Sequence, residues 1–480
     1  MVVRVVIVVM PACLPAGLSW LSRLFLPGLY CHCKNKQSAN PRICEFANHY
    51  FPLFLPKLHS MILQLILYSP FEKEEQLAWR WAEPLEELSR ESEKDILPLG
   101  FFNNLKILEE SLKPFREKAE GLILVAGSGG TERLAQRAME LLPCPVLLLA
   151  NNRNNSLAAA IEINAVAGQS RPIKLVYTPD QGNASLQVRA FISAAKALSR
   201  INSARFGMVG EPSHWLLSSD GVESFGTFGT ELVKIPIQEL IEEYEILEEA
   251  SGDDIKVSVR EKATKVLIKD EALSDASRVF LAMQQIIGRH RLDGLTIKCF
   301  DLLEHKFTAC LGMSLTNDQG IVASCEGDLH ASFSMLTGQL LAGKPVWMAN
   351  PSSIDAEKNL LTLAHCTVPF SMLSETGNTT LTTHMESDLS VAIAGPMQKG
   401  PVTIFRSGRD FKNIHAITGQ IVDTNMGDKS LCRTQAIIKT NTSVSEWMQK
   451  TPGNHQVLAY GNILPELSDF CRFAGVELIL

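Results

Sequence analysis

The stretch Gly121-Leu122-Ile123-Leu124-Val125-Ala126-Gly127-Ser128-Gly129-Gly130-Thr131 joins an apolar run to a glycine-rich turn and the start of a helix. A short apolar run bounded by turn residues is typical of a buried strand. Helical spacing follows over Thr131–Leu142, with Thr131 or Glu132 at its start, and a second strand-like run covers Pro145–Ala150. A strand, a helix and a strand in this order predict a parallel β-α-β unit.

The same alternation extends on both sides of this unit, and it predicts an α/β chain with two Rossmann-like, doubly wound domains at residues 61–168 and 169–294. The expected strands and helices are strand Met61–Tyr68, helices Lys73–Ser92 and Leu105–Lys118, strand Ile173–Tyr177, helix Ser185–Ala204, strands Arg205–Val209 and Leu232–Ile235, helix Ile237–Glu249, and a long helix that ends near Arg289.

The pattern changes after residue 294, where short strand-like runs become frequent. These runs are Leu295–Phe300, Pro401–Phe405, Ala436–Lys439 and Gln456–Tyr460. Short strands separated by turns favour antiparallel pairing. Residues 295–480 are therefore predicted to form a mixed α+β domain built on an antiparallel sheet or barrel.

Residues 1–60 do not resemble the rest of the chain. Met1–Met10 is almost continuously apolar, prolines interrupt the next stretch, and Cys31–Arg42 is polar without periodicity. We expect an atypical extension, disordered or translated upstream of a true start at Met61. A targeting segment is the alternative, although no clean small-residue cleavage site follows. The Cys31-His32-Cys33 cluster lacks a second cysteine pair, which disfavours a zinc site.

Composition limits the possible functions. The chain has 480 residues, 46% of them hydrophobic and 20% charged, with a net charge of −7, which is ordinary for a soluble globular protein. No basic stripe with interleaved aromatic residues indicates nucleic-acid binding. No apolar run reaches the roughly 18 residues of a membrane-spanning helix. The 11 cysteines are scattered, which favours buried free thiols in a reducing cytoplasm.

Two glycine-containing turns are candidate ligand loops. Gly127–Thr131 follows a strand and opens a helix, as a phosphate-binding loop does, but it matches neither GxGxxG nor GxxxxGK[ST]. A plain strand-to-helix turn also requires such glycines. The loop Gly210-Glu211-Pro212-Ser213-His214-Trp215 follows a strand at the sheet edge where α/β proteins bind ligands. His214 and Trp215 there either contact a sugar or cover the sheet edge.

Four stretches place polar side chains just after apolar runs. They are Cys325-Glu326-Gly327-Asp328-Leu329-His330, Val346-Trp347-Met348-Ala349-Asn350, Ala364-His365-Cys366 and Gly453-Asn454-His455. Two imidazoles with oxygen ligands suit a divalent ion such as Mn²⁺. The alternative is structural: the histidines would be hydrogen-bonded core residues, Glu326 a cap or part of a buried pair, and Asp328 the N-cap of a helix over Leu329–Leu341.

From Met61 to Leu480 the chain resembles the L-fucose isomerase/L-arabinose isomerase superfamily of metal-dependent ketol isomerases. The motifs that carry this resemblance keep their order along the chain. They are Gly129-Gly130-Thr131-Glu132, Asn154-Asn155-Ser156-Leu157, Phe206-Gly207-Met208-Val209-Gly210, Cys325-Glu326-Gly327-Asp328-Leu329, Gly343-Lys344-Pro345-Val346, Leu363-Ala364-His365-Cys366, Cys432-Arg433-Thr434-Gln435 and Pro452-Gly453-Asn454-His455.

The resemblance implies a role for individual residues. Glu326 matches a metal ligand and acid/base group, His455 a metal ligand, and His365 a ligand or proton carrier. The second family carboxylate falls on Asn350, whose amide oxygen can ligate a hard cation but carries no charge and cannot act as a general base. His384 and Glu386 match the last active-site loop of the family, and a solvated turn is the alternative.

The implied activity is interconversion of an aldose and a ketose, L-fucose- or L-arabinose-like, through an enediol with Mn²⁺ or another divalent cation. A homotrimer or homohexamer is also implied, in which the Gly127–Thr131 turn or the Asn151–Ser156 loop closes a neighbour's pocket. Two alternatives stay open. One is a sugar-binding protein that lost metal chemistry through Asn350, and the other is a different metal-dependent carbohydrate enzyme, such as an epimerase.

Overall fold

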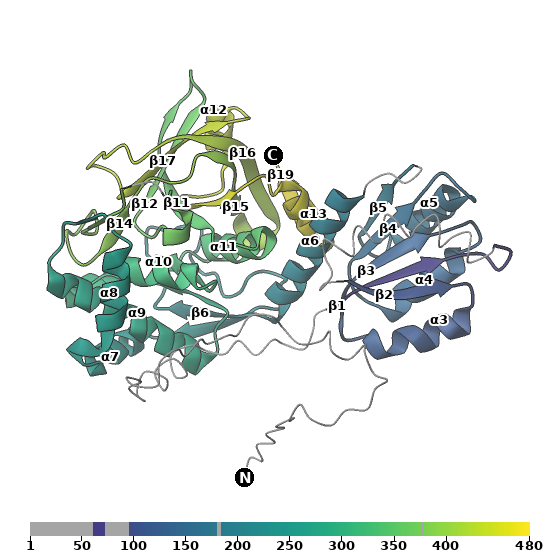
Figure 1. The fold of residues 1–480 in the computed structure, drawn as a ribbon, viewed down its shortest axis with the longest axis horizontal. Coiled ribbons are helices and arrows are strands. Elements are labelled where there is room, and N and C mark those ends of the chain that lie inside the picture. The colour runs from purple at the N-terminus through teal and green to yellow at the C-terminus, as the bar shows by residue number, and fades with distance from the viewer. Residues whose placement is uncertain (1–60, 73–95, 180–183, 376–377) are drawn as a thin grey trace, which may run out of the picture. The chain divides into compact units, whose positions relative to one another are not determined.

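The computed structural model describes residues 61–72, 96–179, 184–375 and 378–480 of the chain. The predicted N-terminal extension, the Cys31–Cys33 cluster and the helix predicted at Lys73–Ser92 lie outside these residues. The described part is a mixed α/β structure in which two parallel sheets precede an antiparallel barrel (Figure 1). The predicted combination of parallel sheets and an antiparallel barrel is thus confirmed.

The first sheet has five parallel strands in the order β2-β1-β3-β4-β5. This is the flavodoxin-like order of doubly wound folds. Its strands are β1 (Met61–Leu67), β2 (Ile96–Phe102), β3 (Ala119–Ala126), β4 (Val146–Ala150) and β5 (Ile173–Tyr177), and its connections contain helices α3 (Leu105–Leu112), α4 (Glu132–Leu141) and α5 (Ser156–Ala167).

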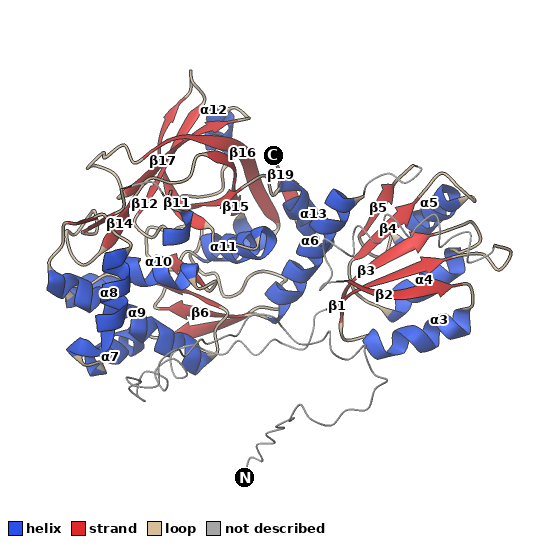
Figure 2. Ribbon diagram, in the orientation of Figure 1, coloured by secondary structure: helices blue, strands red, loops and turns tan. Residues whose placement is uncertain are grey.

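Alternate residues of β1 pack on opposite faces of this sheet. Leu63 and Leu65 belong to the core that β1 shares with α3 and α4, and Figure 2 shows these helices in blue beside the strands. Ile62 and Ile66 belong to the core that contains Phe191 of α6 (Ser185–Ser203). A strand buried on both faces is expected to read as a nearly continuous apolar run, and β1 is apolar except for Gln64.

Strand β2 is absent from the sequence-based prediction. Its sequence contains Pro98 and Gly100, and both residues weaken a strand pattern because proline cannot donate to the ladder and glycine has no side chain to pack. In the structure β2 pairs only with β1 and forms an edge of the sheet. An edge position accommodates proline, because one side of the strand needs no partner.

The second sheet has four parallel strands in the order β10-β9-β6-β7. Leu295–Phe300 was expected among the short strands of the antiparallel region, but β9 pairs in parallel with β6 and β10. The period of an apolar run does not reveal which sheet it joins, so this placement was not visible in the sequence. The strands are β6 (Arg205–Val209), β7 (Glu231–Ile235), β9 (Gly294–Ile297) and β10 (Val322–Cys325), and the helices of this part are α7 (Ile237–Ile246), α8 (Asp253–Glu261), α9 (Asp270–His290), α10 (Cys310–Asp318) and α11 (Leu329–Ala342).

Six antiparallel strands close into a barrel in the order β15-β18-β11-β12-β17-β16, and β16 pairs back to β15. Closure gives every strand a partner on both sides, which removes free sheet edges. The barrel strands are β11 (Trp347–Asp355), β12 (Leu360–His365), β15 (Gly400–Ser407), β16 (Asn413–Thr424), β17 (Thr434–Thr440) and β18 (Gln456–Tyr460); α12 (Val444–Lys450) precedes β18, α13 (Leu464–Ala474) follows it, and β19 (Glu477–Ile479) adds in parallel to β16.

A small three-stranded sheet lies beside these elements, with the order β14-β13-β8. It contains β8 (Lys265–Val266), β13 (Thr380–Thr382) and β14 (Ala392–Ala394). Among the helices that the structure describes, none combines the length and the apolar character needed to cross a membrane. Six of the seven described cysteines are buried and all seven are free thiols, so the prediction of buried free thiols is confirmed for six of the seven cysteines in this part of the chain.

Candidate active site

Glu326 lies at the carboxyl end of β10, in the turn that leads into α11. Its backbone is left-handed, with φ of 64°, and Gly327 follows with φ of 72°. A left-handed non-glycine residue costs about 1–2 kcal/mol, and such strain is common where a side chain must be aimed for function. The turn places the Glu326 carboxylate at the C-terminal edge of a parallel sheet, where α/β folds bind ligands.

Gly327 is needed because another loop approaches it closely. A Cβ atom at this position would lie 2.6 Å from the Cα atom of Pro212. We expect Gly327→Ala to destabilise the fold by about 1–2 kcal/mol through its backbone conformation and by about 1–3 kcal/mol more through the steric overlap. Urea unfolding monitored by circular dichroism measures the difference.

The matched control for this change is Gly343→Ala at the other end of α11. Gly343 is also left-handed, with φ of 65°, but a Cβ atom there would meet nothing within 4 Å. Its substitution should therefore show the backbone cost alone. Equal losses in the two variants would contradict the close approach of Pro212.

Asp328 is the N-cap of α11, as one reading of the sequence predicted: its side chain accepts from the Ala331 N–H at 3.0 Å. Its carboxylate is fully buried and forms two hydrogen bonds with Arg406, from Nη1 to Oδ2 at 2.9 Å and from Nη2 to Oδ1 at 3.1 Å. Burial opposes ionisation, but Arg406 and His455 hold the pKa of Asp328 well below its ordinary value. Asp328 is therefore an ionised internal anchor.

His455 connects this anchor to Glu326. Its Nδ1 is 2.9 Å from Asp328 Oδ2, and its Nε2 is 3.6 Å from Glu326 Oε1. Burial alone would lower the pKa of His455, but the two carboxylates raise it to about 9. Because Asp328 fixes one ring nitrogen, the other faces Glu326. This carboxylate–histidine arrangement is the kind that orients metal-binding imidazoles.

His365 contributes a second imidazole to this group. Its ring centre lies 5.7 Å from that of His455, and its Nδ1 is 2.8 Å from the hydroxyl oxygen of Thr367. Burial, together with the neighbouring His455, lowers the pKa of His365 to about 3. The ring is neutral at physiological pH, so one ring nitrogen can donate a hydrogen bond and the other can accept one.

Strand register brings Asn350 to the same part of the barrel. Asn350 of β11 pairs with Ala364, which precedes His365, and its neighbour Ala349 pairs with Gln456, which follows His455. The Asn350 Oδ1 atom is buried and has no hydrogen-bond partner within the described structure. An unpaired buried acceptor costs free energy, so this oxygen is available to a ligand.

The loop after β6 contacts the Glu326 carboxylate at Oε2, the oxygen that does not face His455. The Trp215 Nε1–H donates to Glu326 Oε2 at 2.6 Å, and the Ser213 N–H donates to the Glu326 carbonyl at 2.9 Å. Burial raises the pKa of Glu326, but His455 and the indole N–H outweigh this effect and leave it below the ordinary value. Glu326 is thus an ionised, 9% exposed carboxylate held on two sides.

The loop that contains His384 and Glu386 also reaches this region. His384 is 9% exposed, and its ring centre lies 5.9 Å from that of Phe300, which packs against Trp215. Burial and the charge of Glu326 raise the pKa of Glu386. The structure therefore brings together Glu326, His365, His455 and the His384 loop, all predicted from the sequence.

Three atoms are the candidate ligands for a divalent cation, which on binding would displace the proton that the raised pKa of His455 keeps on that ring. The buried His455 Nε2 and Asn350 Oδ1 both lack hydrogen-bond partners among the described residues, and Glu326 Oε1 lies 3.6 Å from Nε2. Within the described ranges, no three His, Cys, Asp or Glu side chains are grouped to hold a metal ion. The candidate set is accordingly one carboxylate, one imidazole and one amide, which suits a hard or borderline cation.

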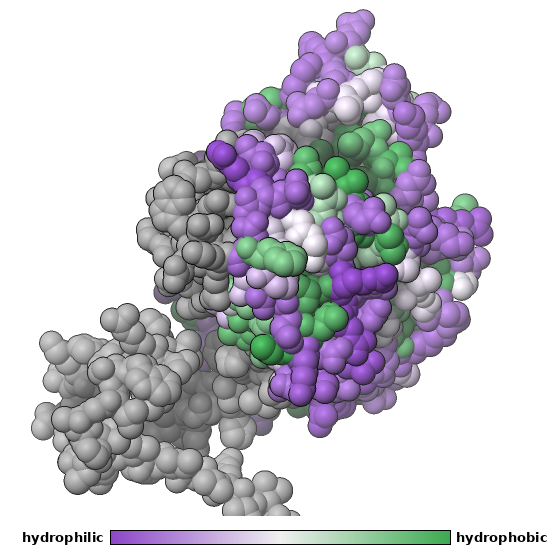
Figure 3. All heavy atoms as spheres, turned by 90° about the vertical axis from the view of Figure 1, so that its right-hand side faces the viewer, coloured by the Kyte–Doolittle hydropathy of each residue, from purple (hydrophilic) through white to green (hydrophobic). Residues whose placement is uncertain are grey.

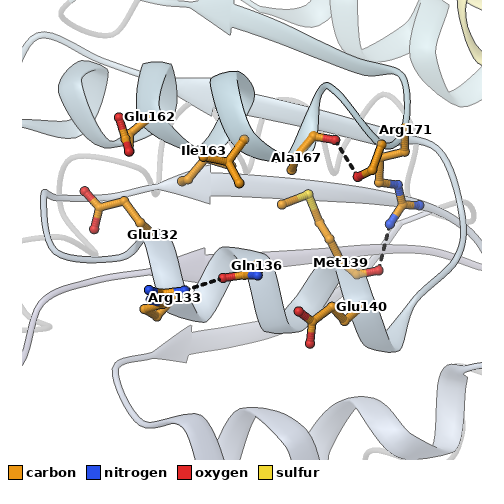
Figure 4. A pocket seen from close by; sticks show the side chains of 11 residues that line it. Glu132, Arg133, Gln136, Met139, Glu140, Glu162, Ile163, Ala167 and Arg171 are labelled. Carbon is orange, nitrogen blue, oxygen red and sulfur yellow. Dashed lines mark hydrogen bonds between the residues drawn. The ribbon is translucent and has the colours of Figure 1, made fainter.

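A separate cavity of about 670 Å³ lies between α4 and α5 of the first sheet domain (Figure 4). Met139 and Ile163 supply apolar lining, and Arg171 donates to the Met139 carbonyl at 2.7 Å. On this side of the molecule hydrophobic residues gather in patches among hydrophilic ones (Figure 3). None of the predicted site residues is among the described residues that line this cavity, so it is distinct from the Glu326 site.

The glycine turn before α4 is stabilised by its own contacts. The Thr131 hydroxyl donates to the Ser128 carbonyl at 2.9 Å, and the Ser128 hydroxyl accepts from the Ser69 N–H at 2.8 Å. Gly127 approaches the Leu67 carbonyl so closely that a Cβ atom would lie 2.7 Å from it. These are the contacts of a tight strand-to-helix turn.

Sequence comparison identifies sugar isomerases as relatives, although no family model matches the chain. The chain is 24% identical to the sulfoquinovose isomerase of Priestia aryabhattai over 331 residues. This aligned region covers 65% of this chain and 73% of the relative. It is 21% identical over 365 residues to the sulfoquinovose isomerase of Alkalicoccus urumqiensis, with 72% and 82% covered.

Comparison with solved structures gives only a weak likeness. The glucose-galactose binding protein GanP from Geobacillus stearothermophilus is 13% identical, with 59% of this chain and 92% of that chain covered, at a TM-score of 0.16. A score this low does not indicate a shared fold. The sequence relatives instead indicate an isomerase, an intramolecular oxidoreductase, as predicted, and at low identity they support an aldose–ketose sugar isomerase.

Proposed function

We propose that this protein is a metal-dependent ketol isomerase that interconverts an aldose and a ketose through an enediol. The observation that carries the proposal is the setting of Glu326. An ionised, buried carboxylate stands at a sheet edge in a strained turn, with an imidazole 3.6 Å from its free oxygen. Such a group is suited to remove and return a proton at carbon.

The residues divide the chemistry between them. Glu326 takes the proton from C2 of the aldose and returns it to C1, and neutral His365 passes a proton between the sugar oxygens. Glu326, His455 and the Asn350 amide would hold the cation. When bound, a divalent ion such as Mn²⁺ polarises the carbonyl and stabilises negative charge on the sugar oxygens. Asp328 and Arg406 keep His455 in place.

Two substrate classes are proposed. Sulfoquinovose is the sugar in the name of the relatives, and an L-fucose- or L-arabinose-like sugar is implied by the motif resemblance. A panel containing all three sugars, incubated with protein and Mn²⁺ in deuterated water, tests them. Deuterium exchange at C2 with appearance of the ketose, followed by nuclear magnetic resonance, supports the isomerase.

The same assay separates the alternatives. An aldose with altered stereochemistry at C2 would indicate an epimerase, and sugar binding without exchange would indicate a sugar-binding protein. Removal of metal with a chelator should abolish exchange, and Mn²⁺ should restore it. As the resemblance implies, we expect a homotrimer or homohexamer, and sedimentation at working concentration measures the assembly. The free thiols favour a reducing cytoplasm.

Asn350→Asp is expected to tighten Mn²⁺ binding by at least about tenfold, because an anionic ligand adds attraction to a hard dication that the amide lacks. Isothermal titration calorimetry measures the affinity. Asn454→Asp is the matched control, since Asn454 is exposed and adjoins His455, so it adds the same charge without joining the donor set. Equal affinities in both variants would show that Asn350 is not a ligand.

A further inference from the structure

The indole of Trp215 makes a specific contact with the proposed base. Its N–H donates to Glu326 Oε2 at 2.6 Å, whereas Oε1 faces His455 Nε2 at 3.6 Å. The two carboxylate oxygens are therefore in different surroundings. A hydrogen bond to a charged acceptor is stronger and more directional than a neutral one, so the indole fixes the rotation of the carboxylate.

The backbone around Trp215 is fastened to the Glu326 turn. The Ser213 N–H donates to the Glu326 carbonyl, and the Leu216 N–H donates to the Ser213 carbonyl, each at 2.9 Å. Gly327 has no side chain to hold Pro212 away. The loop and the Glu326 turn are thus joined both through backbone contacts and through the indole.

Trp215 also presents an aromatic surface at the site. Its ring packs edge-on against Phe300, with centres 5.0 Å apart at 87°, and Phe300 packs in the same way against His384. Trp215 is nevertheless 44% exposed. A large, partly exposed ring beside a buried carboxylate is suited to the apolar C–H face of a sugar, while its N–H end remains hydrogen-bonded.

We propose that Trp215 is a positioning residue for Glu326 and that the exposed face of its indole is the wall against which the sugar packs. This inference rests on the proposed isomerase function. It assigns two separable roles to one side chain, since the N–H orients the base and the ring surface binds the substrate.

Two substitutions separate these roles. Trp215→Phe keeps an aromatic surface and removes the N–H, so kcat should fall by about 10- to 100-fold while KM changes little. Trp215→Ala removes both, so KM should rise by a further factor of about ten. Because Trp215 is partly exposed, both variants should fold, and their melting temperatures check this.

Fluorescence tests the placement without turnover. Mn²⁺ is paramagnetic and quenches an indole that lies close to it, so Mn²⁺ should quench part of the emission of the native protein, which has six tryptophans. Trp215→Phe should lose a large part of this quenching, while Trp347, in the strand that carries Asn350, accounts for the remainder. Trp447→Phe is the control, because Trp447 lies in α12, which carries no proposed site residue.

The outcomes distinguish this inference from the function on which it rests. Native protein that neither exchanges C2 protons nor binds Mn²⁺ would refute the proposed function and the inference together. Native activity with kcat of Trp215→Phe within twofold of native would refute the positioning role alone. Unchanged KM in Trp215→Ala would refute the sugar wall.

Discussion

Replacing Glu326 with glutamine is expected to lower kcat by about 100- to 10,000-fold, the range that a general acid–base group contributes. Glutamine has nearly the same size but cannot take a proton from carbon at neutral pH. Its amide oxygen can still accept the Trp215 N–H, so the fold should be retained. Exchange of the C2 proton of the active sugar, measured by nuclear magnetic resonance, should fall in parallel with kcat.

Glu386→Gln is the matched control for this experiment. Glu386 is a second carboxylate in the electrostatic neighbourhood of Glu326, but it lies in the loop before β14 and has no hydrogen bond to the histidines among those that the structure describes. Its substitution should leave kcat within a few-fold of native. If Glu386→Gln loses the activity and Glu326→Gln keeps it, the assignment of the base is wrong.

Replacing Arg406 with methionine is expected to destabilise the protein by about 3–5 kcal/mol, the cost of leaving a buried charge without its partner. The side chains of Arg406 and Asp328 are both fully buried, and Arg406 Nη1 lies 2.9 Å from Asp328 Oδ2. Arg406 also donates to the His455 carbonyl at 2.7 Å. Urea unfolding measures the loss, and a weaker Mn²⁺ affinity should accompany it because His455 loses its support.

A double variant tests the physical reason for this loss. Asp328→Asn combined with Arg406→Met removes both charges, and asparagine still caps α11, so part of the lost stability should return. Arg260→Met is the matched control, since Arg260 forms an exposed ion pair with Asp270 at 2.7 Å; exposed pairs contribute little. If the double variant is less stable than Arg406→Met alone, the unpaired charge of Asp328 is not the cause of the lost stability.

The sequence predicts strands well where both faces are buried. It predicts them poorly where an edge position or a distant pairing partner determines the strand. Strand Arg205–Val209 and strand Gln456–Tyr460 were predicted with the bounds that the structure has. Strand β2 was missed because Pro98 and Gly100 break its pattern, and an edge position tolerates both. The antiparallel sheet predicted for Leu295–Phe300 was wrong, because periodicity shows burial, whereas long-range pairing decides which sheet a strand joins.

The candidate site shows the same division. Residue types after apolar runs indicated Glu326, His365 and His455, and the structure brings them together. Arg406 was missed, although an arginine directly after the apolar run Pro401–Phe405 is a signal that a buried partner exists. The bond between Trp215 and Glu326 joins residues 111 positions apart, and no local pattern reports such a contact.

The closed barrel has a consequence for how this kind of enzyme can acquire new substrates. Asn350, His365 and His455 stand on or directly beside three neighbouring strands whose hydrogen-bonding edges are all occupied. The distances between these residues are therefore fixed by the hydrogen-bonded pairing of the strands, so one residue cannot shift without its neighbours. The loops that carry Trp215 and His384 belong to no ladder. Selection for another sugar is expected to act on these loops, while the positions of Asn350, His365 and His455 in the barrel stay unchanged.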